Sequence, residues 1–201
     1  MIALKPADLS SNDVYRLLIS VVVPRPIGWA STLGANGIPN LAPFSFFNAV
    51  GANPPTIMIS VEQRAGQAKD TLRNIQETGE FVINIVDHAL AEAMVQSSGD
   101  WPYDVDEFVM AELEKAPSLE VKPPRVAQAP VALEARLTQI VPVEGTDNIM
   151  VLGRVVCFHL REGLLRPNGL VDATLLRPLA RLGGSEYAIL GQVLSLRRPK
   201  V

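Results

Sequence analysis

The sequence has little of what several classes of protein require. Its 201 residues include one cysteine, Cys157, which excludes an intramolecular disulfide and a metal site built from several cysteines. The two histidines, His88 and His159, are far apart in the chain and do not by themselves make a histidine-rich metal site. No apolar run approaches the roughly 20 residues of a membrane-spanning helix, and the first residues lack the pattern of a signal peptide. These absences favour a cytoplasmic protein without a membrane segment.

An excess of charge is also missing. There are 18 Lys and Arg residues against 21 Asp and Glu, which gives a net charge of −3, and the basic residues are scattered. Because a nucleic-acid-binding face normally carries a basic cluster, we expect no nucleic-acid partner. Hydrophobic residues make up 48% of the chain, enough for one substantial core. The length therefore predicts a single domain over residues 1–201.

Proline and glycine, in contrast, are abundant. Sixteen prolines and fourteen glycines separate short β-branched and apolar runs, which is typical of a closed or sandwich-like β architecture with a few added helices. Residues 97–130 are expected to form an ordered excursion with a short helix near 106–111. Strands are expected over 27–33, 56–61, 81–86, 131–141 and 149–160, with a return segment over 41–50 that Pro43 interrupts. Helices are expected over 14–20 (capped by Asp13), 69–78 (ended by Gly79), 88–96 and 172–176.

The chemistry is concentrated in two places. Residues 39–48 are densely apolar yet contain Ser, Asn and a central proline, whereas a plain core strand alternates and lacks proline. The proline is expected to free backbone amides and carbonyls, which suit a planar heterocycle with donors and acceptors on its rim. Lys69 and Thr71 lie at the start of a predicted helix, where unpaired amides and the helix dipole favour a phosphate. Asp70 would oppose an anion there, so we assign it to capping.

Together these segments resemble the flavin reductase-like, FMN-binding split-barrel family, which includes flavoredoxins and the reductase components of two-component monooxygenases. The resemblance implies a mainly β fold with added helices, namely an antiparallel split barrel. It also implies a homodimer with FMN near the subunit interface. It is carried by residues 25–32, 40–48 and 69–75, and continues through 79–84, 130–134 and 181–187.

The activity that this resemblance implies is hydride transfer from NADH or NADPH to flavin, with a monooxygenase as the partner that receives reduced flavin. The alternative is a non-enzymatic FMN electron carrier resembling flavoredoxin. An oxidase of the pyridoxamine phosphate type, on a related barrel, is disfavoured because no convincing basic constellation for a substrate phosphate is present. Because hydride moves directly between the two cofactors, no acid or base is obligatory, and we nominate no catalytic residue.

Carried over position by position, the resemblance places FMN on a defined set of residues. Ser31, Thr32 and the segment 42–48 would line the ring and ribityl chain, and Ser60, Lys69 and Thr71 would hold the phosphate. The complete set of candidate binding residues is Arg25, Trp29, Ser31, Thr32, Ala42, Pro43, Phe44, Ser45, Phe46, Asn48, Ser60, Lys69 and Thr71.

A structural role competes with the functional one at several positions. Arg25, between two prolines, is either a fixed surface arginine or a contact to a flavin or nicotinamide phosphate. Trp101 and Tyr103 form a lid over the flavin or anchor their loop. Cys157 and His159 share one face of a strand, and we favour packing over a nucleophilic pair because nothing in the sequence orients the histidine.

Overall fold

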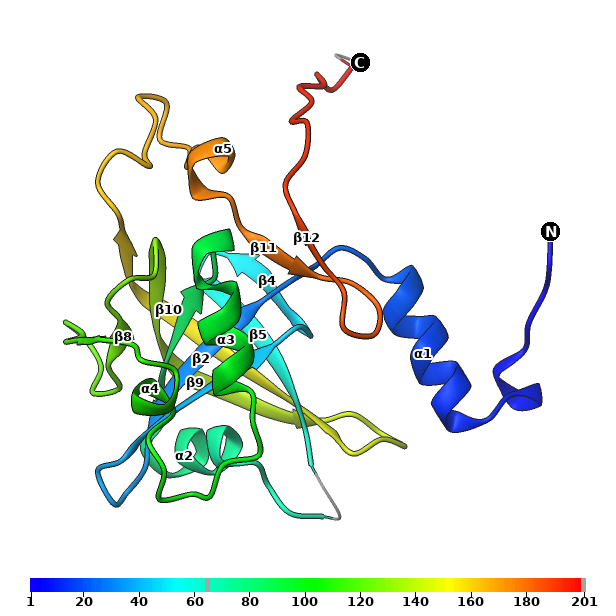
Figure 1. Cartoon of the computed structure of the whole chain (residues 1–201), viewed down its shortest axis with the longest axis horizontal. Helices are drawn as coiled ribbons and strands as arrows, with labels where there is room; N and C mark the ends of the chain where they lie inside the picture. Colours follow the sequence, from blue (N-terminus) through cyan, green and yellow to red (C-terminus); the bar gives the residue numbers. More distant parts are fainter. Residues whose placement is uncertain (64–65, 200–201) are drawn as a thin grey trace.

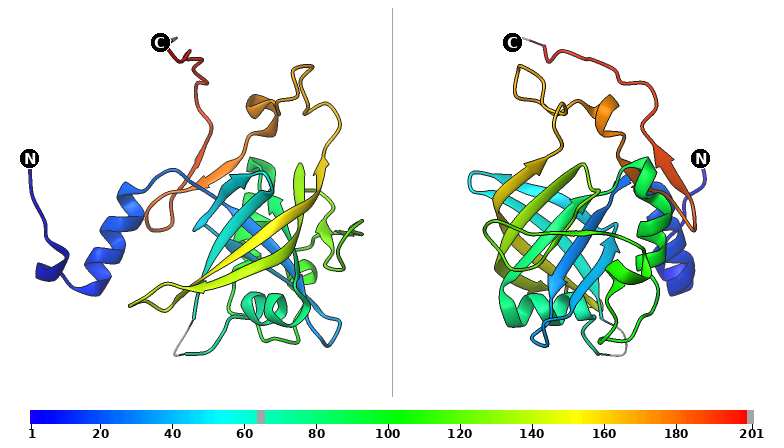
Figure 2. Two further views of the ribbon diagram at one scale, coloured as in Figure 1. Left: turned by 180° about the vertical axis from the view of Figure 1, so that it is seen from behind. Right: turned by 60° about the vertical axis from the view of Figure 1, so that its left-hand side comes forward.

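A computed structural model describes residues 1–63 and 66–199, and its centre is one antiparallel sheet (Figure 1). The strand order is β3-β2-β6-β9-β10-β5-β4, and the sheet curls into a barrel (Figure 2). The two edge strands follow one another in the chain, so the barrel is split between them. This confirms the mainly β, antiparallel split-barrel fold expected from the sequence. The strands are β2 (Gly28–Leu33), β3 (Pro39–Phe44), β4 (Phe47–Ala52), β5 (Pro55–Glu62), β6 (Glu80–Ile85), β9 (Val131–Pro142) and β10 (Asn148–Leu160).

Short helices and two small sheets surround the barrel. β1 (Arg25–Pro26), β11 (Leu179–Arg181) and β12 (Tyr187–Ile189) form a three-stranded sheet, and β7 (Lys115–Ala116) pairs with β8 (Arg125–Val126). Within the described residues, no helix is long and apolar enough to cross a membrane. The helices are α1 (Ser11–Val21), α2 (Asp70–Thr78), α3 (Ala91–Ser97), α4 (Glu107–Met110) and α5 (Ala173–Leu176), with 3-10 turns at Pro6–Asp8 and His88–Leu90.

The core has two main parts, one on each side of β2. Inside the barrel, Phe81 and Ile59 pack with Leu72 and Ile75 of α2, which lie three positions apart and so share one helix face. Outside the barrel, a second cluster that includes Trp29 lies beneath α3 and α4. The interior cluster therefore fixes α2 against the barrel, with the start of the helix near β3.

Two of the predicted helix caps can be compared with the caps in the structure. Gly79 ends α2 in the left-handed region at φ 71°, as expected for a glycine at this position. Helix α1, in contrast, begins before the expected residue 14. Ser10 is its N-cap and accepts a hydrogen bond from the Asp13 amide at 3.2 Å, so the capping assignment of Asp13 was wrong. The Asp13 carboxylate instead accepts a bond from the Ser10 hydroxyl at 2.6 Å.

Pro43 does not interrupt its strand. It lies inside β3 opposite Trp29, and the break comes after Phe44. The reason is that β3 is an edge strand. The Leu41 amide points away from β2 and donates to Glu107 Oε2 at 3.0 Å. Pro43, two residues on, faces the same outer side, so its missing N–H removes no bond from the ladder.

Candidate functional site

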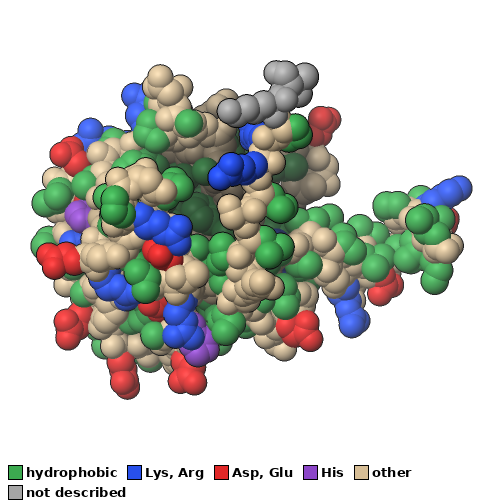
Figure 3. All heavy atoms as spheres, turned by 90° about the horizontal axis from the view of Figure 1, so that it is seen from above, with side chains coloured by type: hydrophobic (Ala, Val, Ile, Leu, Met, Phe, Trp, Pro, Cys, Tyr) green, Lys and Arg blue, Asp and Glu red, His purple; other side chains and the backbone are tan. Residues whose placement is uncertain are grey.

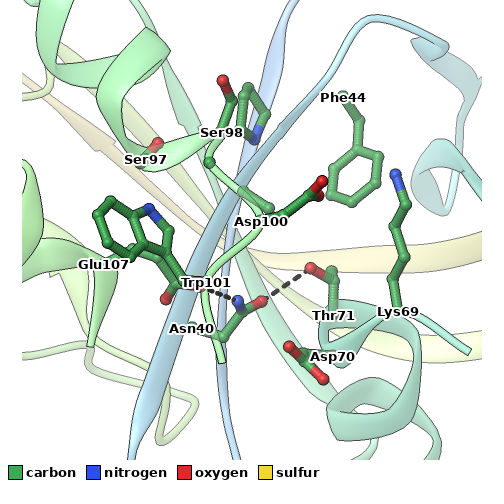
Figure 4. Close-up of a pocket in the computed structure, with 13 residues that line it drawn as sticks. Asn40, Phe44, Lys69, Asp70, Thr71, Ser97, Ser98, Asp100, Trp101 and Glu107 are labelled. Atoms are coloured by element: carbon green, nitrogen blue, oxygen red, sulfur yellow. Dashed lines mark hydrogen bonds between the residues drawn. The ribbon is translucent and has the colours of Figure 1, made fainter. Parts of the chain in front are cut away.

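A cavity of about 300 Å³ joins the outer edge of β3 to the start of α2 (Figure 4). Its other wall is the loop from Ser97 to Trp101, together with Glu107. The volume is at the lower end of the range for ligand sites. Strand β3 and the start of α2, which are well separated in the sequence, therefore line the same cavity.

Five of the candidate binding residues line this cavity. Ala42, Pro43 and Phe44 come from β3, and Lys69 and Thr71 come from the start of α2. The Lys69 side chain runs toward the Phe44 ring (Figure 4). By alternation along the strand, the Pro43 carbonyl points away from β2, as the Leu41 amide does. The cavity thus offers an apolar wall, a backbone acceptor and one ammonium group.

Asn40 connects the two sides of the cavity. Its side-chain amide donates to Glu107 Oε1 at 2.7 Å, and its carbonyl oxygen accepts from the Thr71 hydroxyl at 2.8 Å (Figure 4). Glu107 also holds the Leu41 amide, so one buried carboxylate fixes both the edge strand and Asn40. Neither Asn40 nor Glu107 was nominated from the sequence. Asn40 lies in residues 40–48, one of the segments that carry the family resemblance, whereas no local sequence signal indicated Glu107.

A second set of bonds holds the loop over α2. The Asn74 side chain donates to Thr32 Oγ1 at 3.0 Å and accepts from the Tyr103 hydroxyl at 3.2 Å. The Arg73 guanidinium lies 4.4 Å from the centre of the Tyr103 ring. Tyr103 therefore anchors its loop, and Thr32 is a buried support behind Asn40. Trp101 lines the cavity wall, with its indole N–H donating to the Gln96 carbonyl at 3.3 Å.

Charge in the cavity is mostly negative. In the part of the chain that the structure describes, its lining has one cation, Lys69, and three carboxylates, Asp70, Asp100 and Glu107. Burial raises the pKa of Glu107, although its hydrogen bonds with Leu41 and Asn40 oppose the shift. Burial also raises the pKa of Asp70, and Arg73 opposes it. An anion is therefore favoured only near Lys69 and the first amides of α2.

The assignment of Asp70 to capping was wrong. The N-cap of α2 is Lys69, whose side chain makes no capping hydrogen bond, and Asp70 is the first helical residue. Its carboxylate lines the cavity 3.8 Å from the Arg73 guanidinium. An acidic residue in the first turn is compatible with the helix dipole, which explains its position without a cap.

Comparison with known proteins gives the family. The sequence profile described as the flavin reductase like domain matches residues 20–178. The chain belongs to this family. An uncharacterised protein from Halalkalibacterium halodurans is 40% identical over 203 residues, covering 98% of this chain and 97% of its own. Membership of this family supports a flavin-related redox function.

Two solved structures are also similar over nearly the whole chain. Nitrilotriacetate monooxygenase component B from Bacillus cereus is 36% identical, with a TM-score of 0.94 and 98% of both chains covered. The 2-nitrobenzoate 2-nitroreductase of Pseudomonas fluorescens is 33% identical, with a TM-score of 0.90, covering 98% of this chain and 96% of its own. The whole fold, including the excursion over the cavity, is thus shared with relatives of known structure.

In this flavin reductase-like protein, Arg25 lies outside the cavity and is buried. Its guanidinium donates to the carbonyl of Val22 at 2.8 Å and to that of Leu182 at 2.7 Å, and it also bonds the Ile19 carbonyl. Burial lowers the pKa of Arg25, and Arg181 adds to the shift. Of the two alternatives for Arg25, the fixed surface arginine is wrong because the residue is buried. A contact to a flavin or nicotinamide phosphate stays a prediction, and Arg25 Nε also donates to Ser45 Oγ at 3.4 Å. Arg25 joins α1 to the β11–β12 hairpin.

The remaining candidate residues do not line the cavity. Trp29 is fully buried and donates to Ser97 Oγ at 2.9 Å, so it supports the loop from behind. Ser31 is also fully buried, and its hydroxyl has no hydrogen-bond partner among the described residues. Ser60 Oγ donates to Asn148 Oδ1 at 3.3 Å, Asn48 is exposed, and Phe46 is half-buried.

Ser45 lines an adjoining cavity of about 280 Å³. This second cavity shares Pro43, Lys69 and Ser98 with the first, so the two form one groove. Its other side includes Arg181 and Tyr187. The Arg181 guanidinium lies 4.6 Å from the centre of the Tyr187 ring and bonds its hydroxyl. The sequence segment 181–187, whose role was open, therefore borders the same groove.

Proposed function

We propose that the protein binds FMN in the β3–α2 cavity and transfers a hydride from NADH or NADPH to that flavin. One observation carries the proposal: an apolar strand edge and a lysine-bearing helix start meet at one cavity, in a chain of the flavin reductase-like family. The apolar strand edge suits a flat ring, and the lysine-bearing helix start suits a phosphate.

The donor set agrees with FMN. Ala42 and Phe44 would contact the ring, and the outward Pro43 carbonyl would accept a hydrogen bond from its rim. Lys69 and the first amides of α2 would hold the phosphate. The Thr71 hydroxyl already donates to Asn40, so we expect it to position Asn40, and its backbone amide to face the phosphate.

When bound, FMN supplies the two-electron acceptor, and the protein orients the reactants and excludes water. We expect the nicotinamide nucleotide to occupy the adjoining cavity, beside Ser45 and Arg181. Trp101 and the loop before it would shield the flavin from solvent. No side chain has to transfer a proton in this step, so we propose no catalytic residue.

Oxidation of NADH and NADPH by the purified protein, in air and with added FMN, tests the proposal. The reductase predicts turnover of at least one nucleotide in large excess over the enzyme. If neither nucleotide is oxidised by a protein that is yellow as isolated, the reductase is refuted and the carrier resembling flavoredoxin is supported. The same assay with each nucleotide alone decides between NADH and NADPH.

We also propose a homodimer. Helix α1 extends away from the barrel (Figure 1). This projecting part of the chain is rich in hydrophobic side chains (Figure 3). Leu18 is 50% exposed and Val21 is 71% exposed, which is costly for a monomer in water. Sedimentation analysis should give a dimer, and Leu18→Glu with Val21→Glu should give a monomer. Arg16→Glu on the same helix is the control. A monomeric wild-type protein at micromolar concentration would refute the dimer.

The proposal includes a partner and a location. The similarity to a monooxygenase component B supports a monooxygenase as the acceptor of reduced flavin. We place both proteins in the cytoplasm, where nicotinamide nucleotides are available. Addition of a purified monooxygenase should couple nucleotide oxidation to product formation, and failure of every candidate oxygenase to draw on the reduced flavin would count against this role.

A further inference from the structure

Three side chains of the metal-ligand type gather on the outer face of the barrel, away from the groove. They are Glu134 on β9 and Cys157 and His159 on β10, and their ligand atoms all lie within 4.8 Å of one another. None of the three lines the two cavities that form the groove. The cluster is therefore separate from the proposed flavin site.

The topology brings the three together. Cys157 and His159 are two apart on one strand and so share a face, and Glu134 is the cross-strand partner of Cys157. A register shift between Val155 and Cys157 marks a bulge immediately before the cluster. Bulges re-aim side chains and often lie beside functional sites.

Glu134 is oriented as a ligand carboxylate would be. Its side chain is 0% exposed. It accepts bonds from the backbone amides of Leu119 at 2.8 Å, Glu120 at 2.6 Å and Val121 at 3.2 Å. Such hydrogen bonds are typical of the groups that fix metal-bound carboxylates. His159 makes the remaining bond to Glu134 Oε1.

The spacing agrees with zinc-type coordination. Cys157 Sγ lies 3.6 Å from His159 Nε2. A tetrahedral zinc ion, with Zn–S of about 2.3 Å and Zn–N of about 2.0–2.1 Å, sets these two atoms about 3.6 Å apart. Bound zinc would also separate the nitrogen from the carboxylate oxygen, to about 3.3 Å. The His159 side chain is 18% exposed, so its ring can move outward.

There is access from solvent. His159 lines a surface cavity of about 250 Å³, together with Arg125 and Arg161. Arg161 is paired with Asp87 at 3.5 Å, and Arg125 donates to the Pro117 carbonyl at 3.1 Å. Both cations are therefore held by other groups, and His159 borders a cavity that solvent can reach.

We propose that Glu134, Cys157 and His159 bind one divalent transition-metal ion of the zinc class, with water in the fourth position. A mixed O, S and N donor set suits zinc or cobalt and does not suit magnesium or calcium. A metal ion binds the thiolate form of cysteine, so binding releases the proton of the Cys157 thiol. The ion would fix residues 119–121 to the sheet through Glu134.

Cobalt(II) is the probe for the test, with the metal-free full chain. Because the chain has one cysteine, a cobalt–thiolate absorption band reports on Cys157 alone. We expect one equivalent to give this band, with release of the Cys157 thiol proton, and zinc to abolish it. His159→Gln should lower cobalt affinity by at least the roughly 10- to 100-fold seen for lost supporting groups. The control is His88→Gln, which changes the other histidine and should bind like wild type.

Wild-type protein provides a test that needs no variant to fold. Saturating zinc should slow alkylation of Cys157 at least tenfold, since a metal-bound thiolate is protected. The proposal is overturned if millimolar cobalt gives no thiolate band, or if zinc leaves the alkylation rate unchanged. It is also overturned if folded His159→Gln retains wild-type affinity, because the metal would then lie elsewhere.

Discussion

Replacing Lys69 with alanine isolates the phosphate end of the proposed FMN site. Lys69 is the N-cap of α2, but its side chain makes no capping hydrogen bond, so the helix start is unaffected. The side chain borders both cavities of the groove. The substitution therefore removes positive charge where the phosphate is expected and leaves the apolar wall of β3 intact.

The size of the effect follows from the contact that is lost. A hydrogen bond to a charged group contributes about 1.5–3 kcal/mol, and 1.4 kcal/mol is a factor of ten in affinity. We therefore expect the FMN dissociation constant to rise roughly 10- to 100-fold. Riboflavin has the same ring and ribityl chain without the phosphate, so its dissociation constant should change by less than about twofold.

Quenching of flavin fluorescence measures both ligands. Wild type, Lys69→Ala and the control Lys122→Ala, an exposed lysine on another surface, are titrated with FMN and with riboflavin. Unchanged FMN affinity in Lys69→Ala would refute the phosphate assignment. Equal losses for the two flavins would also refute it, because Lys69 would then act on the ring.

Three further predictions address charge and packing. Asp70→Asn should bind FMN up to about fivefold more tightly at pH 8, since it removes a repulsion of at most about 1 kcal/mol. Burial raises the pKa of Asp70, so the two dissociation constants should converge as the pH falls through that pKa, and a ratio that is constant with pH would contradict this. Gly153→Ala should lower the free energy of unfolding by at least about 1–3 kcal/mol in urea titrations, because overpacking is costly and the new Cβ would lie 2.3 Å from Phe81 Cζ. Gly79→Ala meets no atom within 4 Å, so only its φ of 71° matters, and a loss of about 1 kcal/mol is expected; a larger loss at this position than at Gly153 would contradict the reasoning.

Local sequence signals predicted most of the fold. Leu72, Ile75 and Gly79 define α2 by spacing and by a left-handed cap, and both properties lie within one short segment. The long strands β9 and β10 alternate clearly and pair as neighbours. The proximity of β3 to α2 could be predicted only from the family resemblance, because no local rule relates two segments so far apart.

The remaining features depend on contacts between distant residues. Glu107 bonds the amide of Leu41, 66 positions earlier, and nothing near either residue indicates the pairing. Pro43 was misread because a proline inside a strand predicts a break unless the strand is known to be an edge. The burial of Arg25 could not be predicted locally, because one of the carbonyls that it bonds belongs to Leu182, 157 positions away.

In the proposed FMN site the outer edge of β3 has to remain accessible, and an accessible strand edge invites pairing with another chain. Here the three outward positions offer no donor to an incoming strand. The Leu41 amide is taken by Glu107, and Pro39 and Pro43 have no amide hydrogen. A β-ladder needs donors as well as acceptors, so the edge can accept bonds from a small molecule yet does not template strand addition. Strand addition at this edge is therefore disfavoured even when the proposed site holds no ligand.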